Sequence, residues 1–524
     1  MTRGNPRVED FSDEDSPLLY APVPEEHDPA EHFSRLTEGF QANILSAPPN
    51  SIISHDSSGY RALDECIDEI GIGRFQLRLL ALTSFAYFIE AAEYSLLGLM
   101  YPLLAEDFKV SSETELAVIG SLGGMGMIIG ATFFAQFSNT FGRRLAYQLS
   151  LAICFLFSLV SSFCGSVTAF ALARAGLGFG YGGNIVSSTT LLMEFTPTPN
   201  RARFMNIAGI FYGIGAIFVV ALGWIIVPVI GWRWLLRIVS FCSIPTILLL
   251  PFLPESPRFY IMRRRPREAV EVINVVASTN AIPVPRRATI EAFTLRSEPL
   301  DVKNQFIRLG ESWKTTLPLA LVWFTHSFAG AINGFIPLEI SKRDSSKTSA
   351  KYEISLVLSC GCLVGNLILF FSTVRFGRLF QLRIGLFLTA IMSALLGVES
   401  SAIYVYIMTF FYAIISMFPL SMLYLYTGEV HQTETRTIAV AICQFGHRLA
   451  PVFSPFVVAA LDDVGSFTVT AIVFGAFYFL SFLISLSLKI ETFGRPLVEA
   501  DDLDKEVKKF KVDEEEARIF LKKS

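Results

Sequence analysis

The amino-acid sequence predicts an all-α membrane protein with twelve transmembrane helices in two pseudo-repeated six-helix bundles. The chain of 524 residues is 52% hydrophobic, contains 47 Phe and is only 17% charged. This composition leaves too little polar surface to cover a soluble globule. Twelve apolar segments are each long enough to cross a hydrocarbon core of about 30 Å as a helix. The segments also fall into two sets of six that share a sequence pattern.

The predicted spans define the organisation of the chain. A central loop over 255–312 separates an N-terminal bundle over 73–254 from a C-terminal bundle over 313–490. We expect a disordered acidic tail over 1–72, which is Pro/Ser-rich and resembles no signal peptide, and a second tail over 491–524. The spans are expected at 79–104, 116–137, 145–164, 167–193, 204–230, 234–253, 315–338, 354–374, 380–398, 402–426, 437–460 and 467–488.

A charged motif recurs in the two halves at a constant offset of 235 residues. Basic loop ends alone explain isolated arginines, but not a Glu and an Arg seven residues apart in both halves. Two halves of equal polarity predict a parallel repeat with a substrate site between them. The matched residues are Arg143 with Arg378, Glu194 with Glu429, and Arg201 with Arg436.

The distribution of Lys and Arg predicts that both termini are cytoplasmic. Basic residues cluster at one side of the predicted membrane, and cytoplasmic loops carry such an excess. The loop after the seventh span has four basic residues on the opposite side, fewer than the eight loop-end arginines and the basic stretch 258–267 that set the orientation. The eight arginines are Arg143, Arg144, Arg201, Arg203, Arg375, Arg378, Arg383 and Arg436.

Charged side chains inside the spans are the candidates for binding a substrate or a proton. Such residues are costly in a membrane, and they usually face a partner or a hydrated cavity. From the helical rise, Glu90 lies roughly 16 Å, Glu93 roughly 21 Å and Arg174 about 20 Å from the cytoplasmic face. A pair of Glu93 with Arg174 is therefore feasible, and it could either fix helix register or serve function. Glu90 has no evident partner, which favours binding of a cation or proton.

His326 and Arg448 reach the same central depth from the second half. The histidine could titrate near neutrality or simply bridge neighbouring helices. The arginine is the best candidate for an organic anion, because a guanidinium binds carboxylates with two parallel hydrogen bonds. An ion pair between Arg448 and Glu90 is the alternative.

The repeated charges at the cytoplasmic helix ends predict a gate. Arg143 and Arg144 could pair with Glu194, and Arg378 with Glu429, while Arg201 and Arg436 lie close by in sequence. Such pairs could latch helix ends in one state of a carrier and separate in the other. Exposed ion pairs contribute only about 0 to 1 kcal/mol each, so a latch requires several.

No sequence pattern indicates an enzyme, a cofactor or a metal site. The chain has no G-x-x-x-x-G-K-[ST] loop, no metal-ligand spacing and no nucleophile and base motif. Its seven cysteines show no paired spacing, and no N-glycosylation sequon is present. We expect a monomer in the lipid bilayer and no nucleic-acid partner.

Several motifs resemble the major facilitator superfamily, in particular the branch of organic ion transporters and synaptic vesicle 2-related proteins. They include RFQLRLL at 74–80, the acidic pair Glu90-x-x-Glu93, FGRR at 141–144, RAGLGFGYGG at 174–183, PESPRF at 254–259, and YTGEV at 426–430. The resemblance implies a secondary carrier that moves a small organic ion of either sign by alternating access. Whether transport is coupled to protons is left open. It also implies a vesicle, endosomal or plasma membrane.

Two features favour an alternative, a carrier fold retained as a non-transporting vesicle protein. Asn139 and Val374 replace acidic gate residues that are usual in the family. In the tail, Glu14, Leu18 and Leu19 resemble an acidic dileucine signal, a type of motif that binds clathrin adaptors. The first feature weakens the expected gate and the second predicts vesicle sorting through a partner.

Overall fold

The computed structural model describes residues 58–493 except 111–112, 295–309, 311–312, 335, 338–348, 374, 399–400, 432–435 and 463–466. The sorting residues Glu14, Leu18 and Leu19, and Val374, lie outside the described residues. Twelve helical segments correspond in order to the predicted spans. They are α3 (Arg74–Asp107), α4 (Glu113–Phe141), α5 (Arg143–Ser161), α6 (Val167–Phe195), α7 (Arg201–Ile230), α8 (Trp232–Phe241) with α9 (Ile244–Leu249), α13 (Trp313–Ala329), α15 (Ala350–Ser372), α16 (Arg378–Leu396), α17 (Ala402–Val430), α18 (Arg436–Asp462) and α19 (Phe467–Ser485).

The composition of these helices suits a membrane. Among the described residues, nine helices are long and apolar enough to cross a membrane by themselves. The other three segments, α3, α6 and α18, carry Glu93, Arg174 and Arg448 within their apolar sequences. Each of these three side chains is at most 4% exposed. Their charges are therefore enclosed by protein rather than presented to lipid, as a spanning helix requires.

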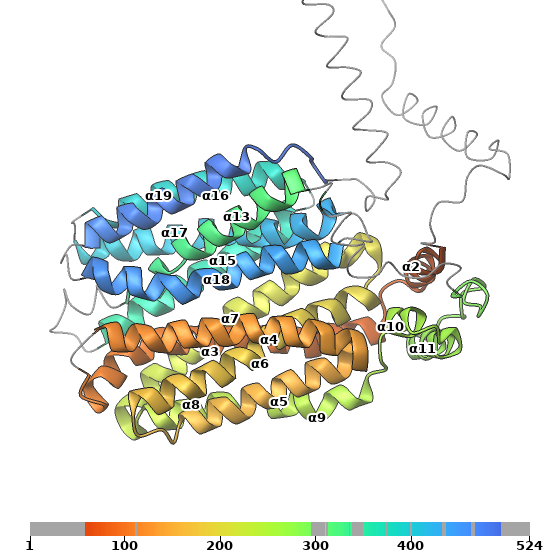
Figure 1. Ribbon diagram of the computed structural model, residues 1–524, viewed down its shortest axis with the longest axis horizontal. Coiled ribbons are helices and arrows are strands. Elements are labelled where there is room, and N and C mark those ends of the chain that lie inside the picture. Colours follow the sequence, from red (N-terminus) through yellow and green to blue (C-terminus); the bar gives the residue numbers. More distant parts are fainter. Residues whose placement is uncertain are drawn as a thin grey trace, which may run out of the picture. The chain divides into compact units, whose positions relative to one another are not determined.

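The helices pack as two similar halves related by the sequence repeat. In the N-terminal half α6 packs on α4 and α5, and in the C-terminal half α17 packs in the same way on α15 and α16. The halves meet where α4 packs on α18 and α7 packs on α15, so the second helix of each half contacts the fifth of the other. Figure 1 shows the N-terminal half in orange to yellow-green and the C-terminal half in green to blue.

Within the N-terminal half, glycines let the backbones of α4 and α6 come into direct contact. A Cβ atom at Gly126 would lie 2.1 Å from the carbonyl oxygen of Ala175, and one at Gly130 would lie 2.0 Å from that of Phe179. No side chain fits at these distances, so these positions of α4 require glycine. Small residues at helix contacts are a general means of close packing in membranes.

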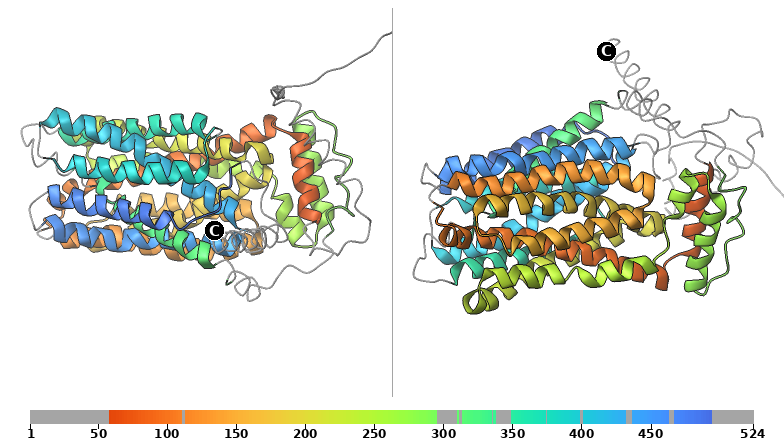
Figure 2. Two further views of the ribbon diagram at one scale, coloured as in Figure 1. Left: turned by 90° about the horizontal axis from the view of Figure 1, so that it is seen from above. Right: turned by 60° about the horizontal axis from the view of Figure 1, so that its bottom comes forward.

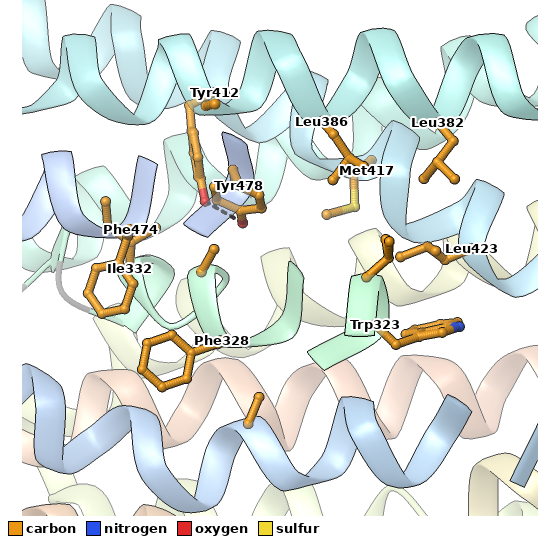
Figure 3. Packing of buried hydrophobic residues seen from close by; sticks show 14 of the residues in the cluster. Trp323, Phe328, Ile332, Leu382, Leu386, Tyr412, Met417, Leu423, Phe474 and Tyr478 are labelled. Carbon is orange, nitrogen blue, oxygen red and sulfur yellow. Dashed lines mark hydrogen bonds between the residues drawn. The ribbon is translucent and has the colours of Figure 1, made fainter. Parts of the chain in front are cut away.

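The C-terminal half has an aromatic core in which side-chain hydrogen bonds join neighbouring helices. Trp323 of α13 is fully buried and donates a hydrogen bond from Nε1 to Thr427 Oγ1 at 2.9 Å. Figure 3 shows Tyr412 and Tyr478 from α17 and α19, whose hydroxyls are 3.1 Å apart. Because buried hydroxyl and indole groups need partners, these bonds fix the relative rotation of the helices that carry them.

A layer of short helices covers one end of the bundle. It consists of α2 (Ser58–Ile70), α10 (Pro257–Met262) and α11 (Pro266–Thr279), which Figures 1 and 2 show beyond the ends of the long helices. We call this end the α2 end. The prediction of a disordered tail to residue 72 is wrong over Ser58–Ile70. Apolar side chains recur at helical spacing there and pack on α11: Leu63, Cys66, Ile67 and Ile70.

An ionic contact fastens α2 to the bundle. Asp64 Oδ1 accepts a hydrogen bond from Arg201 Nη2 of α7 at 2.8 Å and another from Arg258 of α10. Burial would raise the pKa of Asp64, but the two guanidinium groups outweigh this effect and hold the pKa below its ordinary value. One carboxylate thereby ties the N-terminal segment to both the bundle and the central segment.

The close contact of α4 with α6 makes a steric prediction. The change Gly126→Ala should lower stability by about 1–3 kcal/mol, because its methyl group would overlap the backbone of α6. The same change at Gly98 of α3 serves as the control, since a Cβ there meets nothing within 4 Å. Thermal unfolding of the purified proteins in detergent should separate the two variants. Equal melting temperatures would contradict the close contact.

The contact of Asp64 predicts how α2 stays docked. Asp64→Asn should destabilise the docked helix by about 1–2 kcal/mol, a value reduced by the partial exposure of the groups. Hydrogen exchange of the α2 amides is the measurement, and Glu69→Gln, an exposed acid on the same helix, is the control. Accelerated exchange in both variants alike would rule out the specific contact.

The lowered pKa of Asp64 also predicts the direction in which pH changes the stability of this contact. The folded pKa lies below the ordinary value of 3.8, so the stabilisation is complete above that value and is lost as the pH falls through the folded pKa. The protection of α2 amides in wild type, corrected for intrinsic exchange, should therefore stay level from about pH 8 to about pH 5. Loss of protection within that window would refute the assignment to Asp64.

Candidate functional site

The two glutamates of α3 have different environments. Glu93 is 3% exposed, and its Oε2 lies 2.9 Å from Arg174 Nη1 of α6. Ser158 of α5 donates a hydrogen bond to the other carboxylate oxygen, and Ser240 of α8 bonds Ser158 at 2.7 Å. The pair considered from the sequence is therefore present, and it joins four helices of one half. This arrangement supports a role in fixing helix register.

The guanidinium of Arg174 gains a further contact from an aromatic ring. Its Cζ lies 4.9 Å from the centroid of Phe170, one turn earlier on α6. A cation over a ring face is attracted by the ring quadrupole, most strongly where water is excluded. The positive charge is therefore balanced on two sides, by Glu93 and by Phe170, without any group from the C-terminal half.

Glu90, one turn earlier on α3, has no such partner. Its side chain is partly exposed, and among the described residues no ion pair or hydrogen bond involves its carboxylate. Tyr87, Tyr212 and Tyr424 lie close enough to interact with it electrostatically. These tyrosines come from α3, α7 and α17, so the surroundings of Glu90 include both halves of the protein.

Arg448 of α18 faces this region from the C-terminal half. It is 4% exposed, and its Nε and Nη2 atoms have no hydrogen-bond partner in the described part of the chain. Glu90 and Tyr424 are within electrostatic range of it, but no ion pair joins Arg448 to Glu90. The alternative of a direct Glu90 to Arg448 pair is thus absent in this conformation, and both charges are available to a ligand.

The structure adds two polar side chains beside Arg448 that the sequence analysis did not select. Gln444 and His447 precede it by four positions and by one on α18, and Gln444 Oε1 and His447 Nδ1 are buried with no hydrogen-bond partner among the described residues. The His447 ring packs edge-on against Trp323 with centroids 5.0 Å apart. A spacing of three and four residues places 444, 447 and 448 on one helix face, a signal that was available in the sequence.

Part of the boundary between the halves near Glu90 is accessible. Tyr94, one turn further along α3, is 56% exposed, although Tyr212 of α7 and Tyr478 of α19 lie within electrostatic range of it. A side chain that neighbours groups of both halves and is still half-exposed shows that this boundary is not fully packed. Glu90 and Tyr94 share one edge of α3, and both are partly exposed there.

His326 does not join Glu90 and Arg448 directly. It is 5% exposed and packs edge-on against Tyr478 of α19 with ring centroids 5.5 Å apart. Its Nδ1 has no hydrogen-bond partner among the described residues, and His447 lies within electrostatic range. The structure therefore places His326 behind the α18 face in the core of the C-terminal half, where bridging of neighbouring helices is the better supported alternative.

At the α2 end, the predicted gate residues form a compact cluster in the N-terminal half. Arg143 Nε lies 3.4 Å from Glu194, and Nη1 of the same residue donates to the carbonyl of Ser138 at 3.1 Å. Glu255, between the sixth span and α10, accepts the backbone N–H of Arg143 at 2.9 Å and that of Arg144. A carboxylate at this place satisfies free N–H groups and the positive end of the α5 dipole. Burial raises the pKa of Glu255 in spite of these bonds.

The C-terminal half repeats this cluster. Arg378 Nε lies 3.3 Å from Glu429, Nη1 of Arg378 donates to the carbonyl of Thr373, and Glu491 accepts the backbone N–H of Arg378 at 2.8 Å. The matched glutamates, Glu255 and Glu491, thus cap equivalent helices. Each cluster lies within one half, so neither bridges the two halves in this conformation.

Three predicted gate residues lie elsewhere or cannot be assigned. Arg144 does not contact Glu194, and its Nη1 donates instead to the carbonyl oxygen of Leu253 at 2.7 Å. Arg201 pairs with Asp64 of α2. The side chain of Arg436 lies outside the described residues. Asp64 was missed because its helix was assigned to the disordered tail.

The enclosed pair of Glu93 and Arg174 predicts coupled stability effects. Glu93→Leu or Arg174→Met alone should cost about 3–5 kcal/mol, because each leaves one uncompensated buried charge. The double variant should be more stable than either single variant, since it removes both charges. Thermal unfolding of all four proteins in one detergent measures this coupling. Additive losses in the double variant would show that the two residues do not act as a pair.

Comparison with known proteins agrees with this architecture. A family model described as "Sugar (and other) transporter" matches residues 77–503. The synaptic vesicle 2-related protein of Rattus norvegicus is 26% identical over 84% of this chain and 82% of its own length. The organic cation/carnitine transporter 7 of Arabidopsis thaliana is 26% identical over 85% of this chain and 97% of its own.

Solved structures of the major facilitator superfamily have the same fold. The proton:xylose symporter XylE bound to 6-bromo-6-deoxy-D-glucose superimposes with a TM-score of 0.68 and 17% identity, over 82% of this chain and 99% of that one. The fold class and the resemblance inferred from the sequence motifs are thereby confirmed. The chain belongs to the sugar (and other) transporter family of the major facilitator superfamily, whose members are membrane transporters and not enzymes.

Proposed function

We propose that this transporter carries a small organic ion, which binds between the halves at Glu90 and Arg448. The observation that carries the proposal is that these two opposite charges come from different halves, lie within electrostatic range of each other and have no ionic partner among the described residues. A charged side chain inside the membrane is energetically costly, and such residues usually mark a functional site. A ligand that contacts both residues contacts both halves and can therefore sense their relative position.

Alternating access is supported by how the halves meet. The two main contacts between the halves, α4 with α18 and α7 with α15, are equivalent under the repeat. At the α2 end Asn206 Nδ2 of α7 donates to Thr373 Oγ1 of α15 at 3.0 Å, and near the other end Trp224 stacks with Tyr352. A rocking motion would exchange such contacts at one end for accessible space at the other.

Coupling to protons would use Glu90. Its carboxylate is unpaired and accessible, so a proton bound there can be exchanged with the space between the halves. Glu93 is unsuited to this task because it is buried and already paired with Arg174 at 2.9 Å. Proton coupling is the part of the proposal that an imposed pH gradient tests directly.

Location is proposed from the tail and from the relatives. The acidic dileucine sequence at Glu14, Leu18 and Leu19 fits binding of a clathrin adaptor, and one group of relatives is named after synaptic vesicles. We therefore place the protein in a vesicle or endosomal membrane, as a monomer with both termini cytoplasmic. Redistribution of a fluorescent fusion after Leu18→Ala and Leu19→Ala would support sorting, and unchanged vesicle targeting would refute it.

Transport by reconstituted protein tests the proposal. Proteoliposomes should accumulate members of a panel of labelled organic anions, cations and zwitterions saturably, and Glu90→Gln should reduce this uptake at least about tenfold, equivalent to about 1.4 kcal/mol. Glu115→Gln, an exposed glutamate of α4, is the matched control. Stimulation by an inward proton gradient in wild type alone would assign proton coupling to Glu90.

The opposite result would favour the alternative function. If folded protein takes up no compound above empty liposomes, the chain is better explained as a non-transporting membrane protein that acts through its tails. Equal uptake by wild type and Glu90→Gln would support the transport function and refute a role for Glu90 in substrate binding.

A further inference from the structure

We propose that the substrate is a small zwitterion whose carboxylate binds Arg448 and whose alkylammonium group binds at Glu90. The inference rests on the proposed function and specifies the chemical class of its substrate. It follows from three observations: the free edge of the Arg448 guanidinium, the tyrosines around Glu90, and the balance of charge between the two residues.

The free atoms of Arg448 define the carboxylate end. Nε and Nη2 lie on one edge of the planar guanidinium, and their parallel N–H groups match the two oxygens of a carboxylate. This is the edge that has no partner among the described residues, on a side chain that is only 4% exposed. Buried donors without acceptors are destabilising. A bound carboxylate would satisfy both donors at once.

Groups beside Arg448 make this end suitable for a polar ligand. Gln444 Oε1 and His447 Nδ1 are likewise buried without a partner among the described residues, and both belong to the same face of α18. Trp323 is fully buried, packs against the His447 ring and keeps its own N–H bonded to Thr427, so it holds the His447 ring in place. A carboxylate here would therefore meet polar groups that converge from one helix.

The surroundings of Glu90 define the ammonium end. Its accessible carboxylate offers a negative charge, and Tyr87, Tyr212 and Tyr424 from three helices lie within electrostatic range. Aromatic rings attract alkylammonium groups through their negative faces, which supplements an ionic contact. The hydroxyl of Tyr87 is held by Thr189 at 2.6 Å, so this ring is fixed in place before the ligand arrives.

The charge balance favours a zwitterion over a simple ion. Glu90 and Arg448 together contribute one negative and one positive charge, and no ion pair joins them. A monoanion or a monocation would leave one site charge uncompensated inside the membrane unless a proton were exchanged. A zwitterion compensates both charges without any proton transfer, which is the lower-energy arrangement in a medium of low dielectric constant.

Binding to the full-length protein in nanodiscs tests the inference with matched probes. The series consists of trimethylammonio carboxylates with spacers of increasing length. Each zwitterion is compared with an isostere in which a tert-butyl group replaces the trimethylammonium group, and with choline, which lacks the carboxylate. We expect at least one zwitterion to bind at least about tenfold more tightly than both partners of its set. If no zwitterion exceeds its tert-butyl isostere, the inference is overturned.

Two charge variants give a second readout. Glu90→Gln should lower affinity for the zwitterion and raise it for the tert-butyl carboxylate, because only the Arg448 charge remains. Arg448→Gln should shift preference toward choline for the converse reason. Thermal unfolding confirms that each variant is folded. Equal losses for all probes in both variants would contradict this assignment of the two ends.

Uptake separates the inference from the proposed function. Accumulation of a tert-butyl carboxylate with one proton per anion, and none of the zwitterion, would overturn the inference and make Glu90 a proton site, while the transporter stands. Binding of the zwitterion without any uptake would support the zwitterion site and refute the proposed transport. Saturable uptake of the zwitterion that requires both residues is the expected outcome.

Discussion

The cost of a charge in the membrane interior is the constraint on which the rest of this structure depends. Glu93 and Arg174 meet it by pairing inside the N-terminal half, where Ser158 also contacts the carboxylate and Phe170 the guanidinium. Glu90, only three residues away, is left accessible. Two glutamates of one helix therefore differ in role. The charge of Glu93 stabilises the fold, and the charge of Glu90 is available for a ligand.

Paired charges also occur at the α2 end, where the two halves repeat each other. Arg143 pairs with Glu194 and Arg378 with Glu429, and the backbone N–H groups of the two arginines donate to Glu255 and Glu491 at equivalent helix starts. Since each cluster stays within its half, its effect in the observed conformation is to keep helix ends together as one body. The missing acids at Asn139 and Val374 therefore leave the arginine clusters themselves intact.

The sequence was sufficient for the spans, the repeat and the family, because hydropathy and motif spacing are properties of consecutive residues. It also predicted that Glu90 and Arg448 reach one central zone, and the two residues lie within electrostatic range of each other. It did not reveal that α2 docks through Asp64, since the acidic composition of the tail masked a helical pattern of four apolar residues. The partners of Glu93 and the free edge of Arg448 depend on side-chain rotation between helices, which no periodicity encodes. His447 could have been predicted, since helical spacing places it on the same face of α18 as Gln444.

The glycine contacts have a mechanical consequence. Inside the N-terminal half a Cβ at Gly130 would lie 2.0 Å from backbone, whereas across the halves one at Gly124 would meet α18 at 3.2 Å and one at Gly213 would meet α15 at 2.9 Å. The backbones are thus interlocked within a half and merely adjacent between halves. When the protein is deformed, the two halves should therefore slide along their interface before either half bends. A few glycines, which lack a Cβ atom, thus make each half stiffer than the interface between the halves.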